Sequence, residues 1–152
     1  MNRVVIESPL RGDRELNKLY ARVCALDCLI RGEAPYASHL FFDHDDLLDD
    51  EVPQQRELGI LAGFAWGAAA DLRVYYLDLG ESAGMRRARF AFPDQPIQDR
   101  RLFARDQNGD RLAQRRYEAW TAATEHRRTT GSAANQYVFL KVIRAAYQEK
   151  LK

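Results

Sequence analysis

The sequence contains little that would make it a disulfide-bonded, fibrous or membrane-spanning protein. Only 2 of its 152 residues are cysteine, which excludes the dense disulfide framework of small secreted domains. With 9 glycines and 5 prolines it is also too poor in these residues for a collagen-like or low-complexity chain. It has no run of about 18 uncharged apolar residues, and its start lacks the layout of a secretory signal peptide. We therefore expect a globular, cytoplasmic protein with no membrane partner.

The two cysteines and three histidines do not have the spacing of a metal site. Cys24 and Cys28 are four residues apart, which places them on one face of a helix and predicts a buried, reduced pair. Zinc would need two further ligands, and His39, His44 and His126 show no paired spacing. We predict no metal site and no bound cofactor.

Neither sign of charge dominates the chain as a whole, but the two halves differ. Residues 1–85 carry 8 basic and 15 acidic side chains, a net charge of −7, and residues 86–152 carry 15 and 7, a net charge of +8. Of the 23 basic residues 19 are arginine, which binds planar anions with two parallel hydrogen bonds. This pattern fits a phosphate-bearing ligand or a self-complementary contact between copies. It does not favour genomic nucleic acid, whose partners are more basic overall.

Strand-like and helix-like segments alternate along the first two thirds of the chain. We predict strands at residues 3–7, 36–42, 73–77 and 95–102. A first helix follows Asp13, a typical N-cap, and ends at Gly32; a second begins at Pro53; a third covers residues 86–91. This alternation predicts an α/β fold, a flavodoxin- or Rossmann-like open parallel sheet of four to five strands with helices on both faces.

The sequence predicts further features for the acidic stretch before the second helix and for that helix itself. The acidic stretch at residues 43–51 is predicted to be a loop, a solvated face or a lid. In the second helix Gly59, Gly63 and Gly67 recur at every fourth residue, so one face is bare and close packing on the sheet is favoured. For Trp66 and Tyr36, stacking on a base and core packing are both open, with the core favoured for Trp66.

The chain changes character after Phe103. We predict helices at residues 111–128 and 133–151, which extend a first domain at 1–103 with a helical region at 104–152. These helices cover either the same domain or a second copy. Their apolar faces and the opposite charges of the two halves predict a homodimer or a higher homo-oligomer.

The loops that follow the first three strands are expected to converge, since ligands bind beyond the carboxyl ends of strands in an open α/β sheet. Gly80 and Gly84 either let the backbone approach a ligand or only turn the chain. Ser82 is positioned to cap a helix whose free N–H groups bind an anion. His39 is a general acid or a structural hydrogen-bonding residue. We expect ligand-binding roles for Ser8, Pro9, Arg11, His39, Asp78, Gly80, Ser82, Gly84, Met85 and Arg86, with Arg87 as a further phosphate contact.

Short segments within residues 1–103 resemble a known superfamily. These are residues 6–9 with Arg11 and Gly12, residues 53–60, residues 70–71 and residues 78–85. They look like a small bacterial and phage branch of the nucleoside 2-deoxyribosyltransferase-like superfamily, which includes nucleotide N-glycoside hydrolases. The resemblance implies a flavodoxin-like sheet with a nucleoside or nucleotide in its cleft.

The resemblance also exposes a departure at the reacting group. Enzymes of that group attack the anomeric carbon with a glutamate in a Ser-x-Gly-x-x-x-Glu arrangement; here Ser82 and Gly84 match, but the glutamate position is Ala88. A carboxylate is needed near the sugar carbon. Glu81 is the favoured replacement as catalytic residue, with Asp78 and Glu7 as alternatives.

Two functional hypotheses therefore stand beside a general interaction role. In the first, the protein binds a nucleoside- or nucleotide-type small molecule without converting it, for example to sequester a nucleotide signal as phage anti-defence proteins do. In the second, it is a hydrolase or transferase that acts on an N-glycosidic bond of a nucleoside or nucleotide. The missing glutamate favours the first.

Overall fold

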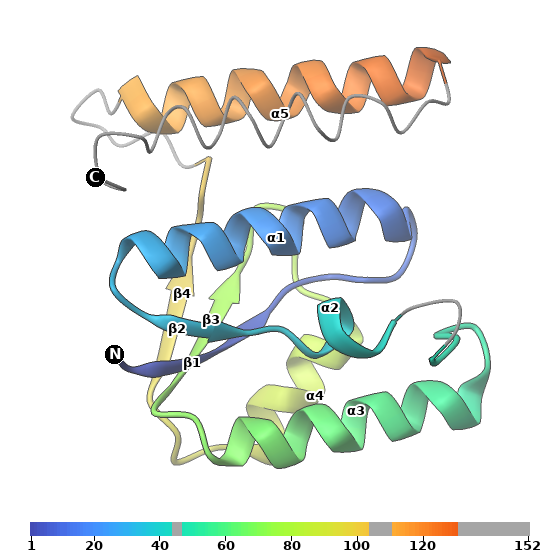
Figure 1. The fold of residues 1–152 in the computed structure, drawn as a ribbon, viewed down its shortest axis with the longest axis vertical. Helices are drawn as coiled ribbons and strands as arrows, with labels where there is room; N and C mark the ends of the chain where they lie inside the picture. Colours follow the sequence, from blue (N-terminus) through green and yellow to red (C-terminus); the bar gives the residue numbers. More distant parts are fainter. Residues whose placement is uncertain (44–46, 104–110, 131–152) are drawn as a thin grey trace. The chain divides into compact units, whose positions relative to one another are not determined.

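The computed structural model describes residues 1–43, 47–103 and 111–130 (Figure 1). The chain divides into two compact units, Met1–Arg100 and Arg101–Lys152, which are described separately.

Four parallel strands form the sheet of the first unit, in the order β2-β1-β3-β4. They are β1 (Arg3–Glu7), β2 (Ala34–Tyr36), β3 (Leu72–Tyr76) and β4 (Ile97–Arg100). β1 and β3 are buried central strands, with Ile6 paired to Val74. The predicted α/β fold with an open parallel sheet is confirmed.

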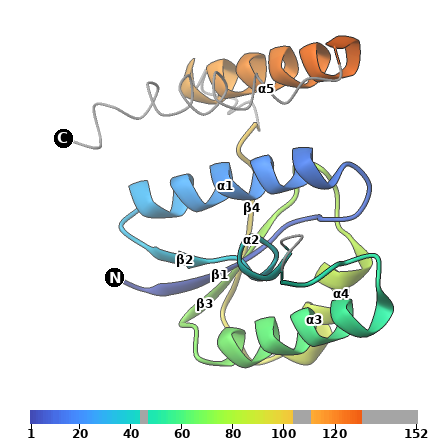
Figure 2. The ribbon, with the colours of Figure 1, turned by 45° about the vertical axis from the view of Figure 1, so that its right-hand side comes forward.

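Helices cover both faces of this sheet. α1 (Arg14–Ile30) lies on one face, and α3 (Pro53–Ala68) and α4 (Ala83–Ala91) lie on the other (Figures 1 and 2). The chain leaves β1 through α1 toward β2, returns through α3 to β3, and continues through α4 to the opposite edge. The direction of winding therefore reverses between β1 and β3, and a crevice opens at such a switch point beyond the strand ends.

α1 is built as its sequence predicts. Asp13 caps its first turn by accepting a hydrogen bond from the backbone N–H of Leu16 at 3.1 Å. Its inner face is mostly apolar, with Asn17 and Asp27 as buried polar residues, and includes Cys24 and Cys28, which are buried and form no disulfide, as predicted. The thiol of Cys28 lies 3.3 Å from the hydroxyl of Tyr76 on β3.

The predicted strand at residues 36–42 is wrong. β2 ends at Tyr36, which pairs with Val5, and Ser38–Phe42 forms a short helix, α2. A short apolar run is compatible with a strand or a buried helix, and periodicity alone does not distinguish them. The packing partners decide: α2 packs against α3 and α1.

The glycines of α3 allow close approach, as expected, but chiefly to two side chains. A Cβ at Gly63 would lie 2.8 Å from the Cβ of Ser38 on α2, and a Cβ at Gly67 would overlap the guanidinium of Arg73 on β3. The favoured prediction that Trp66 is a core residue is wrong, because Trp66 is 63% exposed on the outer side of α3.

In the second unit α5 (Arg111–Thr130) is helical, close to the predicted 111–128. The ring of Trp120 lies 5.5 Å from that of Phe103. The helix predicted at 133–151 lies outside the described residues. Among the helices described, none combines the length and the apolar character that crossing a membrane requires.

Replacing Gly63 with alanine is expected to destabilise the protein, because Ser38 Cβ has little freedom to move away. We expect Gly63→Ala to lower the free energy of unfolding by about 1–3 kcal/mol. Gly59→Ala is the control, since its Cβ would meet Leu48 at an ordinary 3.5 Å. It should raise the stability by up to about 1 kcal/mol. Urea denaturation measures both; a Gly63→Ala protein as stable as Gly59→Ala would contradict the close packing of α2 on α3.

Candidate functional site

A cleft of about 610 Å³ opens at the carboxyl ends of β1 and β3. It joins the loop after β1, the start of α2, the start of α3 and the first turn of α4. Its lining residues are Glu7, Ser8, Leu10, Arg11, Ser38, His39, Asp50, Arg56, Ser82, Ala83, Gly84 and Met85. The strand-end loops therefore meet, and the cleft lies at the switch point of the sheet.

Glu7 is an acidic group of this cleft and is held by a buried arginine. Its Oε1 accepts a hydrogen bond from Nη1 of Arg73, whose side chain is fully buried on β3. Burial raises the pKa of Glu7 to about 7, although the charge and hydrogen bond of Arg73 lower it. The protonation state of Glu7 therefore changes near neutral pH.

The loop after β1 is held by a side chain of α1. Nδ2 of Asn17 donates hydrogen bonds to the carbonyl oxygens of Leu10 at 2.9 Å and Arg11 at 2.8 Å. Gly12 turns the chain with a φ of 94°, which favours glycine. The backbone that carries Arg11 is thus fixed, while its side chain is exposed beside the cleft.

Ser8 and His39 form a polar pair in the cleft wall. Oγ of Ser8 lies 3.1 Å from Nε2 of His39, within hydrogen-bond distance. Burial lowers the pKa of His39 to about 4, even though the carboxylate of Asp43 acts in the opposite direction. The imidazole is neutral at pH 7, with one nitrogen able to donate and the other to accept.

The first turn of α4 forms the opposite wall. Ser82 caps the helix, because its Oγ accepts a hydrogen bond from the backbone N–H of Met85 at 3.3 Å. Ala83 and Gly84 occupy the first helical positions, whose N–H groups have no partner within a helix. A Cβ at Gly84 would meet only Ser82 Oγ, at 3.8 Å, so the backbone here is accessible to a ligand. The positive end of the helix dipole adds to this attraction for anions.

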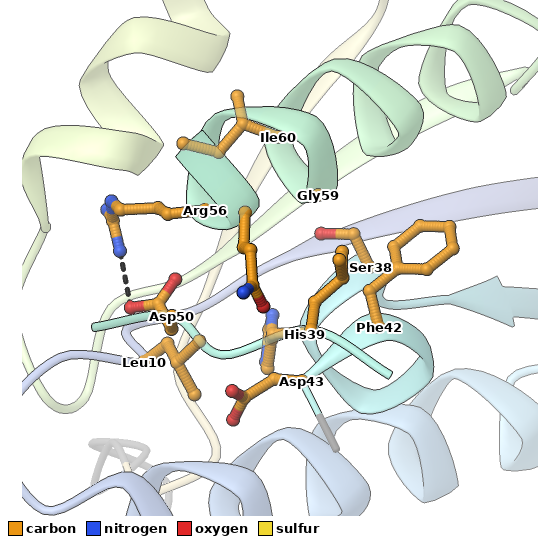
Figure 3. Close-up of a pocket in the computed structure, with 11 residues that line it drawn as sticks. Leu10, Ser38, His39, Phe42, Asp43, Asp50, Arg56, Gly59 and Ile60 are labelled. Carbon is orange, nitrogen blue, oxygen red and sulfur yellow. Dashed lines mark hydrogen bonds and ion pairs between the residues drawn. The ribbon is translucent and has the colours of Figure 1, made fainter. Parts of the chain in front are cut away.

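A second hollow of about 330 Å³ adjoins the cleft (Figure 3). It shares Leu10, Ser38, His39, Asp50 and Arg56 with the cleft. Its other walls are mostly apolar: Phe42, Leu48, Gly59 and Ile60, with Asp43 and Gln55. In Figure 3 the side chain of Arg56 reaches from α3 to Asp50, where Nη1 donates to Oδ2 at 2.5 Å.

The described residues of the acidic segment near this hollow form a loop, as predicted, with Asp49 and Glu51 exposed, and three of its carboxylates make ion pairs. Asp43 is buried, and its carboxylate pairs with Arg14 and, at 2.9 Å, with Nζ of Lys18, both on α1. Burial alone would raise the pKa of Asp43, but the hydrogen bonds and charges of these two cations lower it overall. Asp49 lies 3.5 Å from Arg14. The segment therefore links α1 to α3 through Asp43, Asp49 and Asp50. Residues 44–46 lie outside the described residues.

Several residues predicted for the site lie elsewhere. The carboxylate of Asp78 accepts a 2.5 Å hydrogen bond from the hydroxyl of Tyr20 on α1. Gly80 turns the chain at a φ of 85°. Glu81 pairs with Arg89 at 2.6 Å, and Arg86 donates to the carbonyl oxygen of Glu81 at 2.9 Å. The lining of the cleft does not include Pro9, Asp78, Gly80, Glu81 or Arg86.

Arg87, the further phosphate contact expected from the sequence, instead links two helices. It donates two hydrogen bonds to Glu57 on α3, at 2.7 and 2.6 Å. Ala88, where the resemblance places a glutamate, is buried in α4.

The predicted residues that do line the cleft are Ser8, Arg11, His39, Ser82, Gly84 and Met85. Sequence reasoning missed Arg56 and Asp50. The signal was present, because Arg56 lies in the first turn of a helix whose start was predicted at Pro53. The helix on the other face of the sheet, α3, also begins near the carboxyl ends of the strands.

Comparison with protein families gives one match. A model described as a domain of unknown function (DUF7768) matches residues 2–93, more than half of the chain. The chain belongs to this family. The DUF7768 match contains every lining residue of both hollows, and it ends before β4 and α5. A search of curated proteins and a search of solved structures each found no match.

Within the described parts of the chain, no three His, Cys, Asp or Glu side chains gather in a way that could hold a metal ion. The cleft itself offers its arginines, the first turn of α4, the Ser8 and His39 pair and the Glu7 carboxyl group.

His39 should make stability depend on pH in a defined window. Its pKa is about 4 in the folded protein and about 6.5 when exposed, so between these values the unfolded chain binds more protons. Its contribution is complete above pH 6.5 and is lost as the pH falls to 4, by about 2–3 kcal/mol.

Glu7 acts in the opposite sense over a similar range, because its pKa is raised: its contribution is complete below pH 4.5 and is lost as the pH rises to about 7. The test is therefore the difference between wild type and His39→Gln, measured by urea denaturation from pH 4 to pH 7. Wild type should lose stability relative to the variant as the pH falls. A difference that stays constant would contradict a neutral His39 in the folded protein.

Proposed function

We propose that the protein binds a nucleotide-type small molecule in the cleft between the ends of β1 and β3. The observation that supports this most directly is the convergence of the loop after β1 and the first turn of α4 on one 610 Å³ cleft at the switch point of the sheet. A small molecule of this class has an anionic part and a planar part. Each of the two adjoining hollows suits one of these parts.

The wider cleft suits the anionic part. Arg11 is exposed at its rim and makes no ion pair with any residue that the structure describes, so its guanidinium is available to a phosphate. Across from it lies the first turn of α4 with Ala83 and Gly84. Arg56 adds a second cation between the two hollows, already partly neutralised by Asp50.

The smaller hollow suits the planar part. Phe42, Leu48 and Ile60 supply apolar walls for a flat ring, and Gly59 adds no side chain between them. Gln55 and Asp50 supply hydrogen-bonding groups for the edge of a heterocycle. A base in this hollow would place its sugar near His39 and Arg56, which border both spaces.

Binding is tested with a panel of nucleosides, nucleoside monophosphates and cyclic nucleotides by titration calorimetry. Arg11→Gln should weaken binding of the best phosphate-bearing ligand about 10-fold or more, since a hydrogen bond to a charged group contributes about 1.5–3 kcal/mol. Arg22→Gln, an exposed arginine on α1 outside both hollows, is the matched control and should leave affinity unchanged. Equal affinity of wild type and Arg11→Gln would contradict the proposal that the phosphate binds in this cleft.

The position of Glu7 favours a second candidate function, hydrolysis of an N-glycosidic bond. Of the three acids considered for the missing glutamate, Glu7 is the one in the cleft lining. In this reaction Glu7 takes a proton from water, the water oxygen bonds to the anomeric carbon, and the carbon–nitrogen bond breaks. The electron pair leaves with the base, which takes up a proton. Arg73 would hold the carboxylate in place.

Turnover is tested by incubating the same panel with the protein and measuring free base by liquid chromatography. In the hydrolase, Glu7→Gln should reduce base release by at least about 100-fold, the usual contribution of a general base, and leave ligand affinity largely intact. Glu81→Gln tests whether Glu81, the alternative acid, is needed for base release instead. Because Glu7→Gln leaves Arg73 buried with a neutral partner, its folding is checked by thermal denaturation. A ligand released unchanged by heat, with no free base, would support binding without conversion and exclude the hydrolase.

A further inference from the structure

The outer side of α3 is an apolar surface that the fold of the first unit does not use. Residues 58–70 contain no charged or polar side chain. The inner face, with Gly63 and Gly67, packs on α2 and β3, but Leu58 is 61% exposed, Leu61 52% and Trp66 63%. A helix that is apolar all round is normally buried on all sides.

Neighbouring aromatic rings extend this surface beyond the helix. The ring of Trp66 lies 5.9 Å from that of Tyr36, which in turn lies 6.4 Å from that of Phe41, itself 63% exposed. The exposed alanines of α3 continue this surface along the helix. A stable interface between two copies would bury about 1,200 Å² or more in total.

We propose that this surface, defined as the outer face of α3 with Trp66, Tyr36 and Phe41, is the interface at which two copies of this chain form a twofold-symmetric dimer. The occupant is a second copy because the face is complementary to itself. Along the row of the face that contains Leu58 and Leu61, these large side chains lie in the first half of the helix and Ala65 and Ala68 follow in the second. Trp66 lies beside this row, next to Tyr36.

An antiparallel pairing about a twofold axis would place Leu58 opposite the partner's Ala68 and Leu61 opposite the partner's Ala65. Large residues then pack against small ones along the whole contact, as close helix pairing requires.

The charges at both ends of the face are already neutralised within one chain. Glu57, at the start, is paired with Arg87 at 2.6 Å, and Asp71, just beyond the end, is paired with Arg3 at 2.6 Å. Among the described residues at the two ends of this face, no unpaired charge therefore opposes the approach of an identical surface or would select a charged partner.

Sedimentation equilibrium of the full chain tests the dimer and its location. Wild type should have twice the mass of one chain. Leu61→Glu should be monomeric at the same concentration, with dimer affinity reduced at least 100-fold, because the carboxylate would be buried in the contact. Phe90→Glu, an exposed apolar residue on α4 outside this face, is the control and should remain dimeric. Circular dichroism checks that each variant is folded.

A monomeric wild type, as expected if the face is covered by the chain's own residues, overturns the proposal. So does a Leu61→Glu variant that remains dimeric, or loss of the dimer in both variants. If Leu61→Glu does not fold, the double variant Leu61→Cys with Ala65→Cys decides. Under oxidation it should give a covalent dimer on a non-reducing gel, and its failure to do so would contradict the antiparallel register.

Discussion

The buried guanidinium of Arg73 is the constraint on which the first unit depends. It lies on a central strand, pairs with Glu7 on the neighbouring strand, donates to Gln95 at 2.9 Å and stacks 4.1 Å above the ring of Phe92. A buried charge is costly unless it is paired and hydrogen-bonded, so each of these partners must be in place. Gly67 completes the arrangement, because any larger residue there would overlap the guanidinium.

This one side chain connects the core to the cleft. Its partner Glu7 is the last residue of β1, and the next residue, Ser8, bonds to His39 of α2. The position of the Glu7 carboxyl group and the direction in which the loop leaves β1 are therefore fixed from the sheet outward. The cleft has an inner end held by the Arg73–Glu7 pair and an exposed cationic rim at Arg11, an arrangement that fits the proposed binding of a small anionic molecule.

The sequence was most informative where local signals agree. The strand at residues 3–7 and the helix after Asp13 were predicted within one or two residues, since a β-branched run, an N-cap and a terminal glycine all indicate the same elements. The segment after Pro35 was misassigned because its apolar run has no period that distinguishes a strand from a helix. Only the packing of Ser38 against Gly63 settles it, and that contact joins residues far apart in the chain.

The same distinction applies to the cleft. Ser8, His39 and Gly84 could be placed together from the rule that strand ends converge, which needs only the order of strands and helices. Arg56 was missed although the start of its helix was predicted at Pro53, because its place in the cleft depends on where that helix begins relative to the strand ends. The sequence also could not show that Glu7 lines the cleft and Glu81 does not, because the pairing of Glu7 with Arg73 and of Glu81 with Arg89 forms only in the folded chain.

The account is tested most directly by mapping where a ligand binds. Amide chemical shifts of the isotope-labelled protein, recorded by NMR during titration with the tightest ligand of the nucleotide panel, should change first at Ser8, Arg11, His39 and residues 82–85. Shifts on the outer face of α3 should stay constant. Saturable binding whose shift changes cluster elsewhere in the chain, with these residues unaffected, would contradict a binding site between the ends of β1 and β3.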